Sequence, residues 1–552
     1  MPNPFVVVIR WVRTFLLFNG YLLAVVGVSV VAALFRKRER DPRARLVRLF
    51  LQSAGGAWIK LGQILAMRMD LLPAAYVDEL SLLLDRVPPF PGAVARATIA
   101  AELGDPSRIF AEFPDEPVAS ASFGQVYRAR LRSGKFVAVK VQRPGLASIV
   151  AADITALKGL AAFIDLFELL GSLRLWEQVI ELETILHEEI DYRFEAHNLR
   201  DAVAATANLK IMAVPQVIDE YSSLRVLTME YLDGVWMNDA LKAIRDNDQE
   251  QLEEYRKNGI DLELVADRIF QIGMRQIFEI GTFHADPHAA NIVIMANNVV
   301  GYVDFGIVGT MDERTRQSQE RYFAALKDGD VGLAARSVRD MVIVPNRARG
   351  QLPAFEMALS KQLREWLRAY RDPRAGLREK SSGRVLIDTL QLIRKHGFSL
   401  SADATRYYRA MIIADVIVLQ LSRRFDALTA LRRYFERRRA RDLRVAMREP
   451  NLRRVAGDYF NLALKGPSII ERSLIELQLS NDTFETAVSR VFAVARIVKN
   501  TAALGFLGVL VARVLFRVTD FGHFFGHERP FLTWGDALFF FALTWIIARA
   551  WE

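Results

Sequence analysis

Three oxygen-bearing side chains lie close together in the segment FHADPHAANIVIMANNVVGYVDFG, residues 283–306. Asn291 follows Asp286 by five residues, and Asp304 follows Asn291 by thirteen, after a short apolar run that reads as a hairpin. A triphosphate needs Mg²⁺, a hard cation that prefers oxygen ligands. We therefore predict that Asn291 and Asp304 bind Mg²⁺. Asp286 would accept a proton from, or orient, the attacking hydroxyl or water.

The spacing H-x-D-x-x-x-x-N, followed by a hairpin and D-F-G, is that of the catalytic and metal-binding loops of the protein-kinase-like fold. Lys140, in the strand-like run FVAVKVQ, matches the lysine that these folds direct against the α- and β-phosphates. Its buried ammonium needs an acidic partner, which the predicted helix 185–198 can supply. Glu189 and Asp191, an E-x-D pair, are the first choice for this partner, and Glu195 is the second.

The segment that should cover the phosphates lacks most of the glycines of a kinase G-x-G-x-x-G loop. Small side chains still allow the backbone to approach a nucleotide, but their Cβ atoms disfavour positive φ, so the nucleotide geometry should differ from that of a typical kinase. The predicted nucleotide-contacting residues of this loop and the strand after it are Ala119, Ser120, Ala121, Ser122, Phe123, Gly124, Gln125 and Val126.

The composition of the chain limits the classes of protein to which these motifs can belong. The chain has 552 residues, of which 51% are hydrophobic and 25% are charged, so it can form a sizeable core and is too polar for a polytopic transporter. It contains no cysteine, which excludes disulfides, Cys-ligated metal sites and a thiol nucleophile. A net charge of +9 favours an anionic partner without deciding between nucleotide, lipid and nucleic acid.

The pattern along the chain predicts a small mixed lobe before a large helical one. Residues 41–110 indicate amphipathic helices broken at prolines, and residues 117–143 indicate a β-hairpin that turns at Ser133-Gly134. Helical periodicity spans residues 153–198, two further strands are expected within 212–234, and helices dominate beyond Leu241.

Apolar runs occur at both ends of the chain. Residues 14–35 carry no charge, and as a helix they would extend roughly 33 Å, enough for a bilayer core. The basic RKRER at 36–40 follows this run and would place the next domain in the cytoplasm; a buried helix is the alternative. The runs 501–512 and 537–548 are each too short to span unaided, and could form a membrane hairpin or pack on the folded body.

Together the motifs resemble those of the UbiB/AarF family of atypical kinase-like ATPases, which is linked to ubiquinone biosynthesis. The resemblance rests on ASASFGQV, the lysine strand, HADPHAAN…DFG, and K-x-G-Q from Lys60 to Gln63. It implies that the K-x-G-Q helix folds over the active site, with Lys60 and Gln63 facing the nucleotide. From the residues alone, Lys60 could equally be a surface lysine.

The resemblance also implies slow ATP hydrolysis, or phosphorylation of a small or lipid-like substrate, with ATP and Mg²⁺ as cofactors and membrane lipids and quinone-pathway intermediates or enzymes as partners. A pseudokinase scaffold and a genuine protein kinase are the alternatives. A nucleic-acid role ranks last, because only the net charge and the arginine-rich segment 432–454 favour it.

The predicted fold class is α+β, a bilobal protein-kinase-like fold with an N-terminal helical extension, a large helical C-terminal lobe and transmembrane helices. The predicted location is the inner, cytoplasmic membrane, with the kinase-like domain facing the cytoplasm. The predicted domains are an anchor (1–40), the K-x-G-Q extension (41–112), the N-lobe (113–240), the C-lobe (241–490) and a membrane-associated hairpin (491–552).

Overall fold

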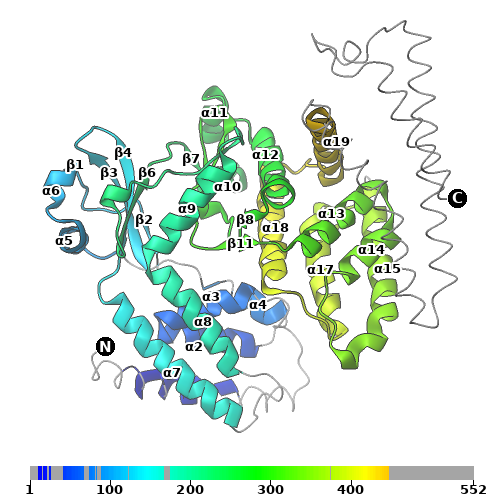
Figure 1. Cartoon of the computed structure of the whole chain (residues 1–552), viewed down its shortest axis with the longest axis horizontal. Helices are drawn as coiled ribbons and strands as arrows, with labels where there is room; N and C mark the ends of the chain where they lie inside the picture. Colours follow the sequence, from blue (N-terminus) through cyan, green and yellow to red (C-terminus); the bar gives the residue numbers. More distant parts are fainter. Residues whose placement is uncertain are drawn as a thin grey trace, which may run out of the picture. The chain divides into compact units, whose positions relative to one another are not determined.

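The structure is a computed structural model that describes residues 42–67, 74–80, 82–83, 89–121, 123–166, 175–372 and 374–446, with short pieces between residues 10 and 25 (Figure 1). The chain divides into two compact units, Met1–Tyr434 and Phe435–Glu552, and in the second unit only residues 435–446 are described. The domain boundaries predicted from sequence remain predictions.

Within the described ranges, no helix is both long enough and apolar enough to cross a membrane. The predicted span 14–35 belongs to these ranges only in part, and the predicted hairpin 491–552 lies outside them. Described residues before and within the N-terminal run pack against the folded body. Arg10 forms an ion pair of 2.6 Å with the buried Asp153, and the rings of Phe18 and Phe50 meet edge to face at 6.0 Å.

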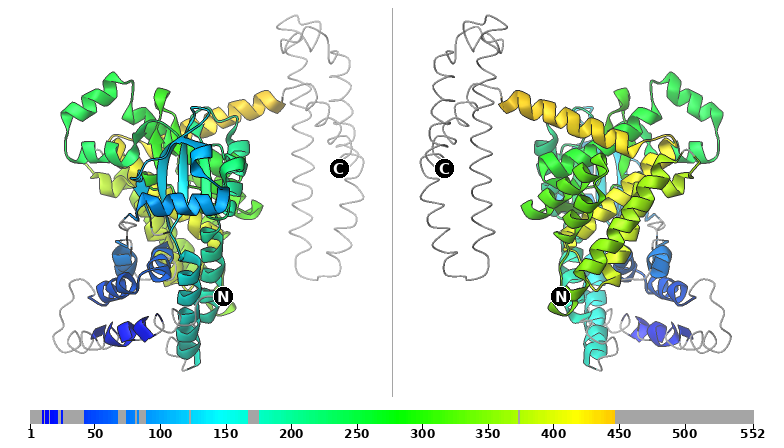
Figure 2. Two further views of the ribbon diagram at one scale, coloured as in Figure 1. Left: turned by 90° about the vertical axis from the view of Figure 1, so that its left-hand side faces the viewer. Right: turned by 90° about the vertical axis from the view of Figure 1, so that its right-hand side faces the viewer.

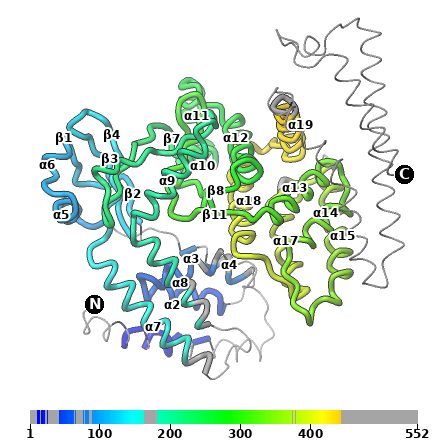
Figure 3. The backbone as a smooth tube through the Cα atoms, in the orientation of Figure 1, coloured from blue at the N-terminus to red at the C-terminus, as the bar shows by residue number. Residues whose placement is uncertain are grey.

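The N-terminal helices pack on two long helices further along the chain. The first three are α2 (Pro42–Ala54), α3 (Ala57–Met67) and α4 (Ala74–Leu80), and the long pair is α7 (Leu146–Leu166) and α8 (Leu175–Ile190). Together they enclose an apolar cluster that includes Phe50, Trp58, Leu80, Phe123, Ile154 and Leu186. This packing places α3, which carries the K-x-G-Q motif, against α7, and Lys60 on α3 reaches Glu189 at the end of α8 (Figure 3).

An antiparallel five-stranded sheet forms the small lobe. Its order is β1 (Phe110–Glu112), β3 (Gly124–Leu131), β4 (Phe136–Gln142) and β6 (Val226–Glu230), with β2 (Ala119–Ser120) paired to β3. Gly134 has a φ of 87°, which glycine adopts without strain, so the predicted turn between β3 and β4 is confirmed. Helix α5 (Gly92–Leu103) covers one face through Ala95 and Ile99, and α6 (Pro106–Ile109) leads into β1 (Figure 2).

Two further small sheets of short strands carry the loops between the lobes. A second sheet has the order β5 (Met212–Ala213), β10 (Val300–Tyr302), β9 (Ile292–Ile294) and β7 (Val235–Trp236), and β8 (Thr282–His284) pairs with β11 (Val308–Thr310). Strands β9 and β10 form the hairpin predicted between Asn291 and Asp304. Asn297 and Asn298 make its turn at φ values of 57° and 61°, a region that asparagine tolerates better than most residues.

The rest of the described chain is mainly helical. Helix α9 (Tyr192–Thr206) joins the sheet to this part, and short turns η1 (Asp219–Tyr221), η3 (Ala289–Asn291), η4 (Ala296–Asn298) and η5 (Asn346–Gln351) connect elements. The remaining helices are α10 (Met237–Arg245), α11 (Gln249–Lys257), α12 (Leu262–Arg275) with the π-helical turn η2 (Gln276–Ile280), α13 (Glu313–Asp328), α14 (Val331–Arg339), α15 (Leu352–Arg371), α16 (Leu377–Lys380), α17 (Ser382–Lys395), α18 (Ala402–Leu421) and α19 (Ala427–Ala446). The first part of the arginine-rich segment lies in α19, and residues 447–454 lie outside the described ranges.

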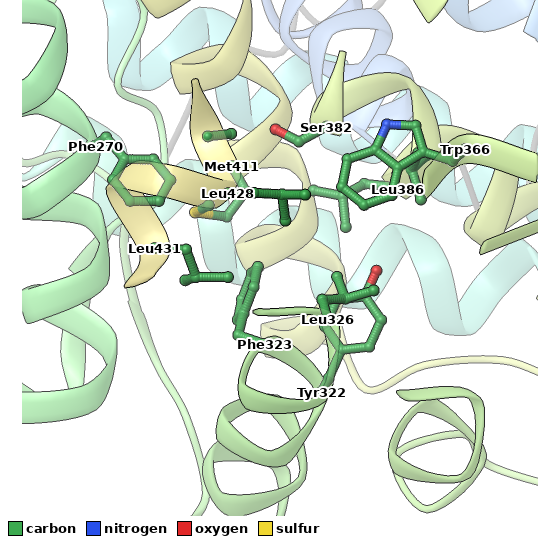
Figure 4. A pocket seen from close by; sticks show the side chains of 12 residues that line it. Phe270, Tyr322, Phe323, Leu326, Trp366, Ser382, Leu386, Met411, Leu428 and Leu431 are labelled. Atoms are coloured by element: carbon green, nitrogen blue, oxygen red, sulfur yellow. The ribbon is translucent and has the colours of Figure 1, made fainter. Parts of the chain in front are cut away.

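A small apolar pocket lies among the helices of this part. Figure 4 shows side chains from α12, α13, α15, α17, α18 and α19 converging on it. Its lining residues are Phe270, Tyr322, Phe323, Leu326, Trp366, Ser382, Val385, Leu386, Met411, Ala427, Leu428 and Leu431. None of them belongs to the candidate active site described below.

Candidate active site

A buried lysine and two carboxylates form the centre of the site. Lys140 lies on β4 opposite Val126 of β3, and its Nζ is 2.7 Å from Glu195 Oε2 and 3.4 Å from Asp304 Oδ2. Burial raises the pKa of Glu195 to about 7, although the ammonium of Lys140 acts in the opposite direction. Burial also acts to raise the pKa of Asp304, but Lys140 and the Gly306 N–H outweigh it and hold that pKa well below its usual range.

The acidic partner of Lys140 is Glu195, the second choice from the sequence, so the first choice was wrong. The reason is a break between two helices: α8 ends at Ile190, and Asp191 caps the start of α9 by accepting the Arg193 N–H at 3.1 Å. Asp191 also pairs with the Arg193 guanidinium, whose hydrogen bonds lower its pKa. Glu195, in the first turn of α9, faces β4 and is 6% exposed.

The other member of the E-x-D pair, Glu189, bonds to Lys60 of the K-x-G-Q motif. Burial raises the pKa of Glu189, and the charges of Lys60, Asp304 and Lys140 also act on it, so the two lysine–glutamate pairs belong to one electrostatic cluster. Lys60 is 8% exposed, which is incompatible with a solvated surface lysine. Gln63 lies on the same helix, α3. Contact of either residue with a nucleotide remains a prediction.

The Ala-rich loop is shorter than the sequence suggested. Ala119 and Ser120 form β2, whereas Gly124, Gln125 and Val126 already belong to β3; Ser122 lies outside the described residues. The Ala121 N–H donates to the Gly124 carbonyl at 2.8 Å, which closes a tight turn. Phe123 is buried against the N-terminal helices, and Gln125 Oε1 accepts the Tyr127 hydroxyl at 2.5 Å.

Arg143, just after β4, holds this loop in place through hydrogen bonds. Its Nη2 donates to the Ser120 hydroxyl at 2.9 Å, and its Nε donates to the Ala121 carbonyl at 3.0 Å. The Arg143 N–H donates in addition to the Phe123 carbonyl at 2.9 Å. Three bonds from one residue therefore give the loop a defined position over the Lys140 strand without the usual glycines.

Glycine is required at position 124 because neighbouring atoms lie very close to its α-carbon, and not because the backbone there is left-handed. A Cβ at this position would lie 2.7 Å from the Val141 carbonyl oxygen and would clash with the Tyr192 hydroxyl. Gly124→Ala should therefore lower the free energy of unfolding by about 1–3 kcal/mol, the usual cost of overpacking. Thermal or urea unfolding measures this loss. Gly350→Ala is the control, because its added Cβ meets no atom within 4 Å; equal stability of the two variants would contradict the assignment.

Asp286 is held from two sides. Arg409, on α18, donates from Nη2 to Asp286 Oδ1 at 2.9 Å, and His288 Nε2 lies 3.6 Å from Asp286 Oδ2. The Asp286 N–H donates to Nδ1 of the buried His284 at 3.1 Å. Burial lowers the pKa of His284, which keeps this ring neutral and able to accept the bond. These contacts fix the orientation of the Asp286 carboxylate in the loop that precedes Asn291.

Asn291 and Asp304 lie at the two ends of one hairpin. Ile292 pairs with Tyr302, and the Val303 N–H donates to the Asn291 carbonyl at 3.1 Å, so Asp304 follows directly beside Asn291. The Asn291 amide nitrogen bonds to the Asp286 carbonyl at 3.3 Å and to His288 Nε2 at 3.2 Å. Because both bonds use the nitrogen, the amide oxygen is the atom that a cation would take.

The donor set at this hairpin fits Mg²⁺ held on a nucleotide. Mg²⁺ usually takes one or two protein oxygen ligands and completes its coordination with phosphates and water. Asp304 and Asn291 offer a carboxylate and an amide oxygen. In the described part of the chain, no group of three or more His, Asp or Glu side chains could hold a metal ion by itself.

The structure adds three residues that the motifs did not indicate. Arg409 pairs with Asp286, Arg143 anchors the loop, and Tyr192 lies under the loop with its ring 5.2 Å from Lys140 Nζ. Tyr192 could have been suspected because it stands three residues before Glu195, on the same helix face. Arg409 stands in a largely apolar helix, RYYRAMIIADVIV, where a charged residue is unusual. Arg143 gave no such signal.

A small lobe built on an antiparallel sheet, a helical lobe, a strand lysine paired with a glutamate, and a hairpin followed by D-F-G define a protein-kinase-like domain. The sequence model of the ABC1 atypical kinase-like domain matches residues 82–337. The chain belongs to the UbiB/AarF family of ABC1 atypical kinase-like proteins, which confirms the resemblance found in its motifs.

Named relatives include two chloroplast proteins of Arabidopsis thaliana. The chain is 37% identical over 310 residues to Protein ACTIVITY OF BC1 COMPLEX KINASE 7, which covers 55% of this chain and 42% of the relative. It is 31% identical over 505 residues to Protein ACTIVITY OF BC1 COMPLEX KINASE 8, and this match covers 84% of this chain and 64% of the relative. The chain thus spans from about two fifths to just under two thirds of the length of these relatives.

Among solved structures, the complex of Rv3197 with erythromycin from Mycobacterium tuberculosis is similar with a TM-score of 0.45 and 23% sequence identity. The match covers 67% of this chain and 90% of that one.

Proposed function

We propose that this protein binds Mg-ATP and hydrolyses it, or transfers its terminal phosphoryl group to a small or lipid-like acceptor. The observation that carries the proposal is the ion pair of Lys140 with Glu195, 2.7 Å, with Asp304 3.4 Å from the same ammonium. In kinase-like folds this lysine contacts the α- and β-phosphates, and the D-F-G aspartate holds the metal. Membership of the UbiB/AarF family supports the same reading.

In this proposal each residue has one task. Lys140, oriented by Glu195, would bind the phosphates, and Asp304 with Asn291 would hold Mg²⁺. When bound, Mg²⁺ neutralises charge on the phosphate oxygens. Asp286, fixed by Arg409, would orient the attacking hydroxyl or water and receive its proton.

We place the activity at a membrane, in the biosynthesis of ubiquinone or another isoprenoid lipid, with membrane lipids and quinone-pathway intermediates or enzymes as partners. The apolar runs 14–35, 501–512 and 537–548 and the basic residues 36–40 support a location at the inner membrane facing the cytoplasm.

The test is ADP release by the full-length protein with Mg-ATP, measured with and without anionic phospholipid vesicles. We expect turnover that rises with lipid. A nucleotide-dependent thermal shift without ADP release would indicate a scaffold, and phosphorylation of a protein substrate at ordinary rates would indicate a protein kinase. For the pathway, quinones are profiled in a deletion strain complemented with wild type or with a Lys140 variant; full rescue by the variant would contradict the proposal.

A further inference from the structure

The side chain of Tyr192 is buried in the candidate active site, yet its hydroxyl makes no hydrogen bond to any residue that the structure describes. The residue is 2% exposed. A buried hydroxyl without a partner is costly, so a native protein normally keeps one only where it serves a purpose. Burial raises the pKa of Tyr192, and the hydroxyl therefore keeps its proton and remains a donor at neutral pH.

The direction of this side chain places the hydroxyl between two phosphate-binding elements of the proposed site. Its ring lies 5.2 Å from the ammonium of Lys140, and Glu195, the partner of that ammonium, is one helical turn further along α9. The hydroxyl itself lies against the α-carbon of Gly124, close enough that no Cβ would fit there. It therefore extends past the lysine to the junction of the Ala-rich loop and β3.

In kinase-like folds the nucleotide phosphates lie between this loop and the strand lysine. The hydroxyl is buried against Gly124, so a phosphate oxygen reaches it only if the backbone at this junction shifts; the hydroxyl is then a donor that has no other partner among the described residues. Phosphate oxygens are strong, charged acceptors, and hydrogen bonds to charged groups are the stronger ones.

We infer that the Tyr192 hydroxyl donates a hydrogen bond to a phosphate oxygen of the bound nucleotide, and so makes this residue a determinant of nucleotide affinity. The inference rests on the proposed function, and it replaces part of the contact that glycine-loop N–H groups give in an ordinary kinase. It predicts that the hydroxyl matters for ATP and ADP, and not for adenosine.

The test is Tyr192→Phe, which removes one oxygen atom and leaves the ring. Calorimetric titration of the full-length protein should show affinity for ATP and ADP lowered about 10- to 100-fold, the range for a hydrogen bond to a charged group, with adenosine binding unchanged. Without nucleotide, the melting temperature should stay equal or rise, because an unpaired buried hydroxyl is lost.

The matched control is Tyr408→Phe. Tyr408, on α18, is also buried and also has a hydroxyl without a partner among the described residues, but its aromatic neighbour is Tyr407. It should show the same change in melting temperature and wild-type ATP affinity. Wild-type ATP affinity in Tyr192→Phe, or an equal loss for adenosine, would overturn the inference alone. A wild-type protein that binds no ATP would overturn the proposed function with it.

Discussion

Asp304→Asn is expected to lower the rate of ADP release by about 10²- to 10³-fold, the loss typical of removing one preorganised group that stabilises charge in a phosphoryl or acyl transfer. The carboxylate lies 3.4 Å from Lys140 Nζ and follows the hairpin that carries Asn291. An amide keeps the shape of the side chain but provides only a neutral oxygen, which binds Mg²⁺ more weakly than a carboxylate.

The measurement is steady-state ADP release at saturating Mg-ATP, with circular dichroism to show that the variant is folded. Asp328→Asn makes the same chemical change at an exposed position at the end of α13, where the aspartate contacts Lys327, and should keep wild-type turnover. Full activity of Asp304→Asn would remove the basis for the metal assignment. A parallel loss in Asp328→Asn would show that the effect is not specific to the site.

Lys140→Met should cost about 3–5 kcal/mol of stability, the usual result of removing one partner of a buried ion pair. Methionine fills a similar volume, so the main effect is that Glu195, 6% exposed, loses the cation that compensates its charge. The same substitution should abolish ADP release, because the ammonium is the group proposed to bind the phosphates.

The stability loss of Lys140→Met should also depend on pH. In the wild type, burial raises the pKa of Glu195 to about 7, and the ammonium partly opposes this, so its removal raises that pKa further. At about pH 5.5 Glu195 of the folded variant is protonated, as it is in the wild type. At about pH 8 the wild type has released this proton, whereas the folded variant must either keep it or hold an uncompensated carboxylate, so the variant loses more stability as the pH rises. Asp304 loses the same ammonium, which is the main cause of its lowered pKa, so its pKa also rises in the variant and acts in the same direction.

Urea unfolding at these two pH values measures the effect, and the destabilisation should be larger at the higher pH. Lys140→Met combined with Glu195→Gln removes both charges, and should recover much of the stability and flatten the pH dependence. An equal loss at both pH values in the single variant would contradict the role of Glu195.

The sequence was sufficient for the parts of the site that local patterns determine. The β3–β4 hairpin follows from strand alternation and Ser133-Gly134, and the hairpin between Asn291 and Asp304 follows from a short apolar run with a polar turn. Both patterns involve residues near one another in the chain, so no long-range contact is needed to interpret them.

The partner of Lys140 could not be ranked in the same way. Glu189, Asp191 and Glu195 all lie in one predicted helix, and a continuous helix offered no reason to prefer the last of them. The actual chain stops α8 at Ile190 and restarts at Tyr192, which turns Glu189 toward Lys60 and Glu195 toward β4. The N-cap residue Asp191 determines where α9 begins and therefore which way Glu195 faces. Because Asp191 stands among other acidic residues, the sequence does not distinguish it as a cap.

Contacts between segments far apart in the chain could also not be predicted from the sequence. Arg409 meets Asp286 across 123 positions of the chain, and Lys60 meets Glu189 across 129. Each pair depends on how whole helices pack, here α18 against the catalytic loop and α3 beside α8, and no spacing rule encodes this. The resemblance to UbiB/AarF proteins suggested that Lys60 faces the site, but it did not supply the partner.

The assignment of Asp304 and Asn291 as metal ligands is tested most directly by the binding of Mn²⁺, as a substitute for Mg²⁺, followed by electron paramagnetic resonance on the full-length protein with ATP. We expect a protein-bound Mn²⁺ signal in the wild type only when nucleotide is present, and its loss in Asp304→Asn at the same ATP concentration. A bound signal of equal strength in Asp304→Asn, or a strong signal without nucleotide, would contradict the claim that this hairpin holds the cation on a nucleotide.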